Sequence, residues 1–164
     1  GTKRISKLCD YLKEISLPWT MMGRLDISPV WLYDKMVDCG CVGMRFGVET
    51  FNIDVLKNIE KGIERRDFRK TLEYICLTYP EVMIHITMMS DMPGQTAEDT
   101  EIDMKIIKEM GFSIDNILRS YQLSKCAPFP GTKLYEQMKT RLDEATLKTY
   151  TLYDGGQDTI MKAS

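Results

Sequence analysis

Residues 42–49 read VGMRFGVE, an alternation that is typical of a β-strand with two different faces. One face is apolar, is expected to pack against helices, and holds Val42, Met44, Phe46 and Val48. The other face holds Gly43, Arg45, Gly47 and Glu49. Two glycines, an arginine and a carboxylate make a poor hydrophobic core. They do allow a ligand to approach the backbone closely and to find charged partners.

Residues 82–89 repeat the same division. Here the apolar face consists of Val82, Ile84, Ile86 and Met88, and the other face of Met83, His85, Thr87 and Met89. Polar residues also gather toward the carboxyl ends of the expected strands, where parallel α/β proteins bind their ligands. An open sheet with one solvated face gives the same alternation and remains an alternative. For His85, the lone histidine, a hydrogen-bonded position in the core is favoured over a substrate contact.

Working outward, helical and strand patterns alternate along the chain. Apolar residues at helical spacing predict helices at 5–15, 29–39, 53–61, 67–79, 97–110 and 133–142. Strands are predicted at 19–24, 42–48, 82–89 and 115–124. Ser28 is expected to cap the second helix with Pro29 at its first position, and Thr96 with Asp99 resembles a capping box. This order predicts an α/β fold with a parallel sheet, which is either open or part of a longer barrel, since four strands cannot close one.

The charge balance argues against some classes of partner. The 22 basic and 24 acidic residues leave a net charge of -2, so we expect neither nucleic acid nor an anionic membrane as a partner. No apolar run approaches the ~18 residues of a membrane span, and no targeting signal is evident, which predicts a cytoplasmic protein. Five scattered cysteines favour reduced thiols over disulfides. Self-association through an uncovered edge of the sheet is a further expectation.

Three short segments together resemble radical S-adenosylmethionine (SAM) enzymes. They are GVET at 47–50 with Lys61-Gly62 downstream, MPGQT at 92–96, and PFPGT at 128–132 followed by Leu134-Tyr135. The resemblance covers residues 18–138. It implies parallel β/α units that form the C-terminal part of a partial (β/α)6, TIM-like barrel, with residues 1–164 a single fragment whose core is 18–142. The proline-rich ending is most similar to the branch that carries a cobalamin-binding domain.

The resemblance also implies cofactors. Members use a four-iron four-sulfur cluster, held by a CxxxCxxC loop, to cleave SAM reductively to a 5'-deoxyadenosyl radical. That loop does not occur in this sequence, and Cys39-Gly40-Cys41 is no substitute for it. We therefore expect the cluster-binding half upstream of Gly1 in a full-length parent. A cobalamin-dependent methyltransferase or oxidoreductase is one form of the implied activity, and this chain alone is expected to be inactive.

The resemblance implies six SAM-contacting residues: Arg24, Glu49, Thr50, Lys61, Thr87 and Ser124. Glu49 would hydrogen-bond the cofactor, and Lys61 would pair with its carboxylate. Structural roles compete with these functional ones. Glu49 could instead pair with Arg45, Lys61 could stabilise a helix end, and Arg24 could form a salt bridge with Asp26. Cys126, near the expected site, is interpreted as an unreactive loop thiol.

Two other functions remain open at this point. One is an α/β-barrel metabolic enzyme that binds a phosphorylated small molecule, although no glycine-rich turn opens a helix after a late strand. The other is a non-catalytic domain that docks a partner through its exposed sheet edge.

Overall fold

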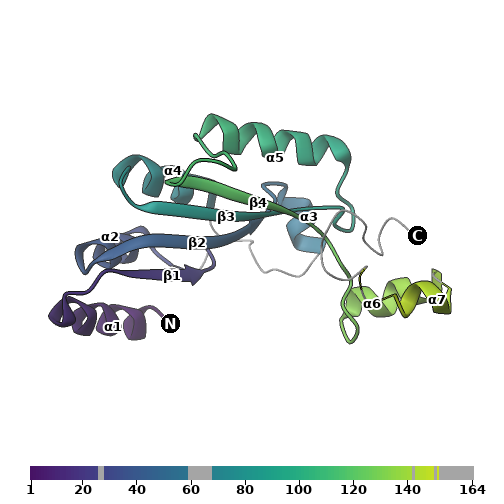
Figure 1. The fold of residues 1–164 in the computed structure, drawn as a ribbon, viewed down its shortest axis with the longest axis horizontal. Coiled ribbons are helices and arrows are strands. Elements are labelled where there is room, and N and C mark those ends of the chain that lie inside the picture. The colour runs from purple at the N-terminus through teal and green to yellow at the C-terminus, as the bar shows by residue number, and fades with distance from the viewer. Residues whose placement is uncertain (26–27, 59–67, 142, 150, 152–164) are drawn as a thin grey trace.

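A computed structural model describes residues 1–25, 28–58, 68–141, 143–149 and 151 of the chain (Figure 1). The strands are β1 (Trp19–Gly23), β2 (Cys41–Glu49), β3 (Met83–Ser90) and β4 (Arg119–Lys125). The helices are α1 (Thr2–Ile15), α2 (Val30–Asp38), α3 (Ile53–Asn58), α4 (Phe68–Thr78), α5 (Ala97–Glu109), α6 (Lys133–Met138) and α7 (Glu144–Leu147), with a 3-10 turn at η1 (Lys139–Arg141).

The four strands form one parallel sheet in the order β1-β2-β3-β4. Helices connect each strand to the next, as Figure 1 shows. The predicted parallel α/β fold is therefore confirmed. Since sequential strands lie side by side throughout, all four carboxyl ends meet at one edge of the sheet.

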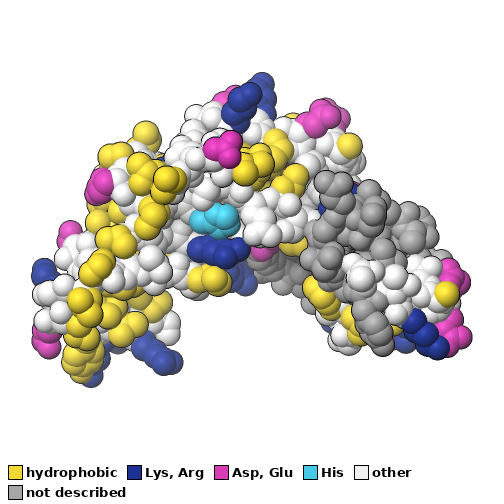
Figure 2. Space-filling view, in the orientation of Figure 1, with side chains coloured by type: hydrophobic (Ala, Val, Ile, Leu, Met, Phe, Trp, Pro, Cys, Tyr) yellow, Lys and Arg dark blue, Asp and Glu magenta, His cyan; other side chains and the backbone are white. Residues whose placement is uncertain are grey.

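The hydrophobic core lies on one face of the sheet. Buried side chains of β2 and β3 pack there against α2, α4 and α5 in a single cluster. Phe46, with no exposed surface, meets the ring of Tyr33 edge to face, with ring centroids 5.8 Å apart. The opposite face lies on the underside of an arch, where the cyan histidine and a basic side chain appear side by side (Figure 2).

Val42 departs from the predicted pattern. Trp19 pairs with Cys41 and Thr20 with Gly43, so Val42 is an extra residue at a β-bulge. Val42 is 41% exposed, while Cys41 before it is buried. The bulge shifts the alternation by one residue, and it therefore corrects the prediction for Val42 while leaving Met44, Phe46 and Val48 buried as expected.

The helix starts agree with the sequence in most cases. Thr96 and Asp99 form a complete capping box, and the Thr132 hydroxyl accepts a hydrogen bond from the Tyr135 amide. The start of α2 is a correction, because Pro29 occupies the N-cap position and Ser28 lies one residue outside it. No helix in the described part of the chain is long and apolar enough to cross a membrane.

The fourth strand begins later than predicted. Residues 115–118 form a turn, in which the Asn116 side chain accepts hydrogen bonds from the amides of Leu118 and Arg119. The strand therefore starts at Arg119 and not at Asp115, because the Asn116 side chain takes the Leu118 and Arg119 amides, while the Leu118 carbonyl still accepts from the Ile84 amide of β3.

Candidate functional site

The carboxyl edge of the sheet contains two residues in an uncommon backbone conformation. Glu49 ends β2 with φ 69°, and Asp91 follows β3 with φ 59°. Left-handed φ values are rare for residues other than glycine, and they persist where the surroundings hold them and often mark functional sites. The two acidic residues lie at the ends of neighbouring strands, so this edge is the first candidate for a ligand site.

Helix α5 holds the turn that follows Glu49. Asp103 accepts a hydrogen bond from the Phe51 amide at 2.8 Å, and Asp99 accepts one from the Asn52 side chain at 2.8 Å. Asp103 is buried, and burial raises its pKa, although contacts with Thr50 and Phe51 act in the opposite direction. Two carboxylates one helical turn apart therefore fix the position from which Glu49 projects.

The turn after β3 is held by its own glutamine. The Gln95 side chain accepts from the Met92 amide and donates to the Met89 carbonyl, both at 3.1 Å. Gly94 has φ 80°, and a Cβ there would lie 2.7 Å from Nδ2 of the Asn58 side chain. The MPGQ sequence is thus explained by a tight turn packed on the end of α3.

Cys126 lies at the same edge. Its amide donates to the Ser90 carbonyl at 2.8 Å, and its side chain packs in a small cluster with Val55 and Met92. Burial first, and then the nearby Asp91 and Glu49 carboxylates, raise the pKa of the thiol. A thiol that resists ionisation is a poor nucleophile, which agrees with the unreactive role expected for it.

The structure brings together three of the six site residues predicted from the sequence. Glu49, Thr87 and Ser124 lie on three adjacent strands in the carboxyl half of the sheet. Ser124 accepts a hydrogen bond from Gln122 at 3.0 Å, and Gln122 pairs across the ladder with Thr87. Gln122 was not among the predicted residues, although the alternation on the fourth strand would have pointed to it.

The other three predicted residues have different positions. Arg24 follows β1 directly and is half-buried. Thr50 has no exposed surface, and its hydroxyl accepts a hydrogen bond from the Asn52 amide at 3.0 Å, which makes it part of the turn held by α5. Lys61 lies outside the described residues.

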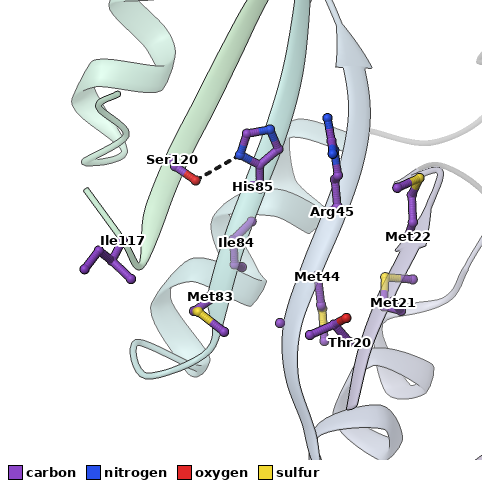
Figure 3. A pocket seen from close by; sticks show the side chains of 11 residues that line it. Thr20, Met21, Met22, Met44, Arg45, Met83, Ile84, His85, Ile117 and Ser120 are labelled. Atoms are coloured by element: carbon purple, nitrogen blue, oxygen red, sulfur yellow. Dashed lines mark hydrogen bonds between the residues drawn. The ribbon is translucent and has the colours of Figure 1, made fainter. Parts of the chain in front are cut away.

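A row of side chains crosses the sheet nearer its amino end. Met22, Arg45, His85 and Ser120 are successive ladder partners on the four strands. The Arg45 guanidinium lies 3.4 Å from the Gln122 oxygen, and His85 Nδ1 lies 2.9 Å from the Ser120 hydroxyl. These residues line a hollow of about 400 Å³, in which Arg45 and His85 project from the same face of the sheet (Figure 3).

The described cysteines do not fit a metal cluster. In the part of the chain that the structure describes, no group of three or more His, Cys, Asp or Glu residues could hold a metal ion. Cys9, Cys39 and Cys41 are buried together in the core. Burial raises the pKa of Cys39 to about 12 and that of Cys41 to about 11, which is the behaviour of structural thiols.

Comparisons with known proteins place the fold but leave the family unassigned. No protein-family model matches the chain. The tRNA uridine(34) acetyltransferases of Methanocaldococcus infernus and Methanocaldococcus jannaschii are each 26% identical over 106 residues, which is 65% of this chain and 19% of each relative. The chain therefore spans about a fifth of the length of these curated relatives.

A solved structure shares the fold. Coproporphyrinogen III oxidase (HemN) from Escherichia coli, described as a radical SAM enzyme, superimposes with a TM-score of 0.61 at 16% identity. The similarity covers 88% of this chain and 32% of the oxidase. This chain therefore shares its parallel β/α fold with about a third of that oxidase.

Proposed function

We propose that this chain supplies part of the SAM-binding wall of a radical SAM enzyme. The observation that carries the proposal is the juxtaposition of the Glu49 turn and the Asp91–Gln95 turn at the carboxyl edge of the sheet. The segments that form these two turns are two of the three that resemble the family, and the fold is shared with one of its enzymes.

The residues at this edge suit the polar groups of SAM. SAM carries a positive sulfonium, an amino acid group and ribose hydroxyls. The carboxylates of Glu49 and Asp91 can accept hydrogen bonds from its ammonium or hydroxyl groups, and the hydroxyls of Thr87 and Ser124 can donate or accept. When bound, SAM supplies the radical chemistry, whereas this chain's residues bind and orient it.

Neither an iron-sulfur cluster nor cobalamin is assigned to residues of this chain. The described cysteines do not fit a cluster, so its ligands belong to a longer parent in this proposal. Cobalamin dependence, with methyl transfer or oxidation as the outcome, is the finer form of the proposal. Its support is the PFPGT ending at residues 128–132.

The sequence relatives favour a second candidate, a part of an enzyme that acetylates a tRNA uridine. The 26% identity over 106 residues supports it. The net charge of -2 argues that this chain itself contributes little to RNA binding, which depends on basic side chains. Under this candidate the RNA contacts come from other parts of the enzyme.

Binding of S-adenosylhomocysteine, which lacks the reactive methyl group, tests the main proposal. Calorimetric titration of the full chain with S-adenosylhomocysteine should show weak binding. E49Q should lower the affinity by about tenfold, because a charge-assisted hydrogen bond is lost. E101Q, on an exposed position of α5, is the matched control and should bind like the wild type.

Other outcomes would point elsewhere. Equal binding by E49Q and wild type would remove Glu49 from the site. Stabilisation by inorganic phosphate with no response to S-adenosylhomocysteine would favour a phosphorylated metabolite as ligand. Assembly at high concentration without response to either ligand would favour an interaction domain.

A further inference from the structure

The hollow lined by Arg45 and His85 lies away from the carboxyl edge. Its lining includes Thr20, Gly43 and Met83, which lie in the amino halves of their strands. Glu49, Thr87 and Ser124 are not part of it. The proposed SAM-binding wall therefore leaves this hollow without an assigned role.

Arg45 has an uncompensated charge in this hollow. Among the described residues, no carboxylate lies within ion-pair distance of its guanidinium, and its hydrogen bond to Gln122 is long, at 3.4 Å. By contrast, Lys35 and Arg69 pair with Asp10 and Glu73. Arg45 is solvent-exposed on the face of the sheet opposite the core, and a guanidinium without a counter-ion is suited there to bind an anionic ligand.

His85 adds a second polar group beside the arginine. Its Nδ1 is engaged by Ser120, but its Nε2 is buried and has no hydrogen-bond partner in the described structure. Buried polar atoms are normally satisfied, so an unpartnered ring nitrogen calls for an explanation. Because Nε2 is closed off from solvent, an anion bound beside Arg45 would act on the ring through its charge and not through a direct contact with Nε2.

The remaining walls are apolar and adaptable. Met22 is 74% exposed, Met83 is 38% exposed and Ile117 is 79% exposed, and all three line the hollow. Gly43 keeps its floor open, because a Cβ there would lie only 3.0 Å from the Thr20 methyl group. Methionine side chains adjust to ligands of different shape. The hollow is large enough for a small ligand, and it combines one cationic side chain with flexible apolar walls.

We propose that this hollow is a second binding site, for a small organic anion with an apolar body. The anionic group would pair with Arg45 beside His85, and the apolar body would lie against Met22, Met83 and Ile117. A carboxylate and a phosphate monoester share the necessary charge, so the test must distinguish them.

The single histidine makes the test specific to this site. Sodium octanoate is titrated into the full chain, and binding is followed by calorimetry and by the NMR signals of the ¹³C-labelled His85 ring. Saturable binding is expected, with a shift of the imidazole signals and a rise in the pKa of His85. The rise follows because an anion beside the ring favours its protonated form. Arg45 is the charged group that faces the ring, and the ring's neighbours on the same face of β3 and β4, which are Met83, Thr87, Ser120 and Gln122, are uncharged.

Charge and shape are separated by matched compounds. Acetate has the same charge without the apolar body, and octyltrimethylammonium has the same chain with the opposite charge, so both should bind at least about tenfold more weakly. Octyl phosphate tests the other anionic source. Tighter binding of octyl phosphate than of octanoate would assign the anion as a phosphate monoester, and tighter binding of octanoate would assign it as a carboxylate.

Variants complete the test. R45Q should weaken octanoate binding by about tenfold or more, whereas R69Q, which removes an exposed arginine of α4, should not change it. E49Q should also bind octanoate normally, so failure of the SAM proposal and failure of this one are distinguishable. Octanoate binding that is unaffected by R45Q, or that leaves the His85 signals unmoved, would overturn the proposal.

Discussion

At the scale of single residues, His85 is expected to make the stability of the fold depend on pH. Burial, and secondarily the nearby Arg45 charge, lower its pKa from the usual 6.5. The unfolded chain therefore takes up a proton as the pH falls through about 6.5, while the folded chain resists protonation until a lower pH. Stability contributed by neutral His85 is present above this range and is lost as the pH falls. In urea denaturation, the free energy of unfolding should fall more between pH 7.5 and pH 5.5 for the wild type than for H85Q.

The Arg45 contribution can be separated from that of burial. R45Q removes the second cause of the lowered His85 pKa. The fall in its free energy of unfolding between pH 7.5 and pH 5.5 should therefore lie between those of the wild type and H85Q. R69Q, on the exposed surface of α4, should follow the wild type. Identical pH profiles for wild type and H85Q would show that the His85 pKa is the same in the folded and unfolded chains.

Much of the residue pattern could be predicted from the sequence, because alternation reports which face of a strand is buried. Met44, Phe46 and Val48 are buried as predicted, as are the apolar residues of 82–88. Val42 could not be predicted, because a bulge depends on how β1 pairs with β2 and leaves no local signal. Asp103 was missed for a similar reason, since its contact with Phe51 joins residues 52 positions apart.

At the scale of elements, Arg119 holds the end of α4 to the sheet. Its buried guanidinium donates to the carbonyls of Val82, Leu118, Cys76 and Tyr79 at 2.6–3.0 Å. R119M would remove the guanidinium donor from all four carbonyls, of which those of Leu118 and Tyr79 keep the backbone amides of Ile84 and Val82 as donors. Since the Val82 and Cys76 carbonyls would lose their side-chain donor in a buried position, we expect R119M to lower the free energy of unfolding by about 3 kcal/mol. R119K should lower the free energy of unfolding less than R119M does, because the lysine ammonium still donates some of these hydrogen bonds. Urea unfolding measures both.

R69M is the matched control for this prediction. Arg69 lies on the exposed side of α4 and pairs with Glu73 one turn away, so its loss should cost less than about 0.5 kcal/mol. If R119M were as mild as R69M, the buried carbonyls would have found other partners, and the role assigned to Arg119 would be wrong.

Element boundaries show why local sequence succeeds or fails. The capping box of α5 is contained in four consecutive residues, so the sequence was sufficient to predict it. The start of β4 was predicted four residues early. Residues 115–118 look strand-like, but the Asn116 side chain takes the amides that a strand would use.

Helix α5 also offers a test of how the Glu49 turn is held. Burial raises the pKa of Asp103, so its ionisation near neutral pH costs stability, and one of its oxygens, Oδ2, has no partner in the described structure. D103N keeps an acceptor for the Phe51 amide without a charge and should be at least as stable as wild type at pH 7. D103A removes the acceptor and should lose about 1–3 kcal/mol.

Ligand binding distinguishes positioning from stability in this pair. If Asp103 positions Glu49, D103A should weaken S-adenosylhomocysteine binding at a temperature where the variant is fully folded, and D103N should restore it. If urea unfolding showed that D103N and D103A are equally destabilised, a second donor would form a hydrogen bond with the Asp103 carboxylate.

At the scale of the whole molecule, the sequence predicted the order of elements and the parallel sheet, because each β/α unit carries its own pattern. The site could be predicted only in part. Glu49, Thr87 and Ser124 come together because strand ends converge on one edge, whereas Thr50 proved to be buried in its turn. The hollow around Arg45 and His85 depends on four strands lying in register, which no single segment specifies.

The sheet edge formed by β1 supports a last prediction. β1 pairs only with β2 in the described structure, and Met22 on this edge strand is 74% exposed. Leu8, Tyr11 and Ile15 of α1 are also more than half exposed. An edge strand with apolar neighbours favours pairing with another copy, so light scattering after gel filtration should show association that grows with protein concentration.

M22K places a charge on the edge strand and should shift this equilibrium toward the monomer, because a lysine there opposes strand-to-strand pairing. The control is I114K, which introduces the same charge at a side chain that is 73% exposed in the loop before β4. Reduced association in M22K alone would place the contact at β1. Equal reduction in both variants would mean that net charge is responsible, and a concentration-independent monomer in the wild type would show that this edge does not pair at all.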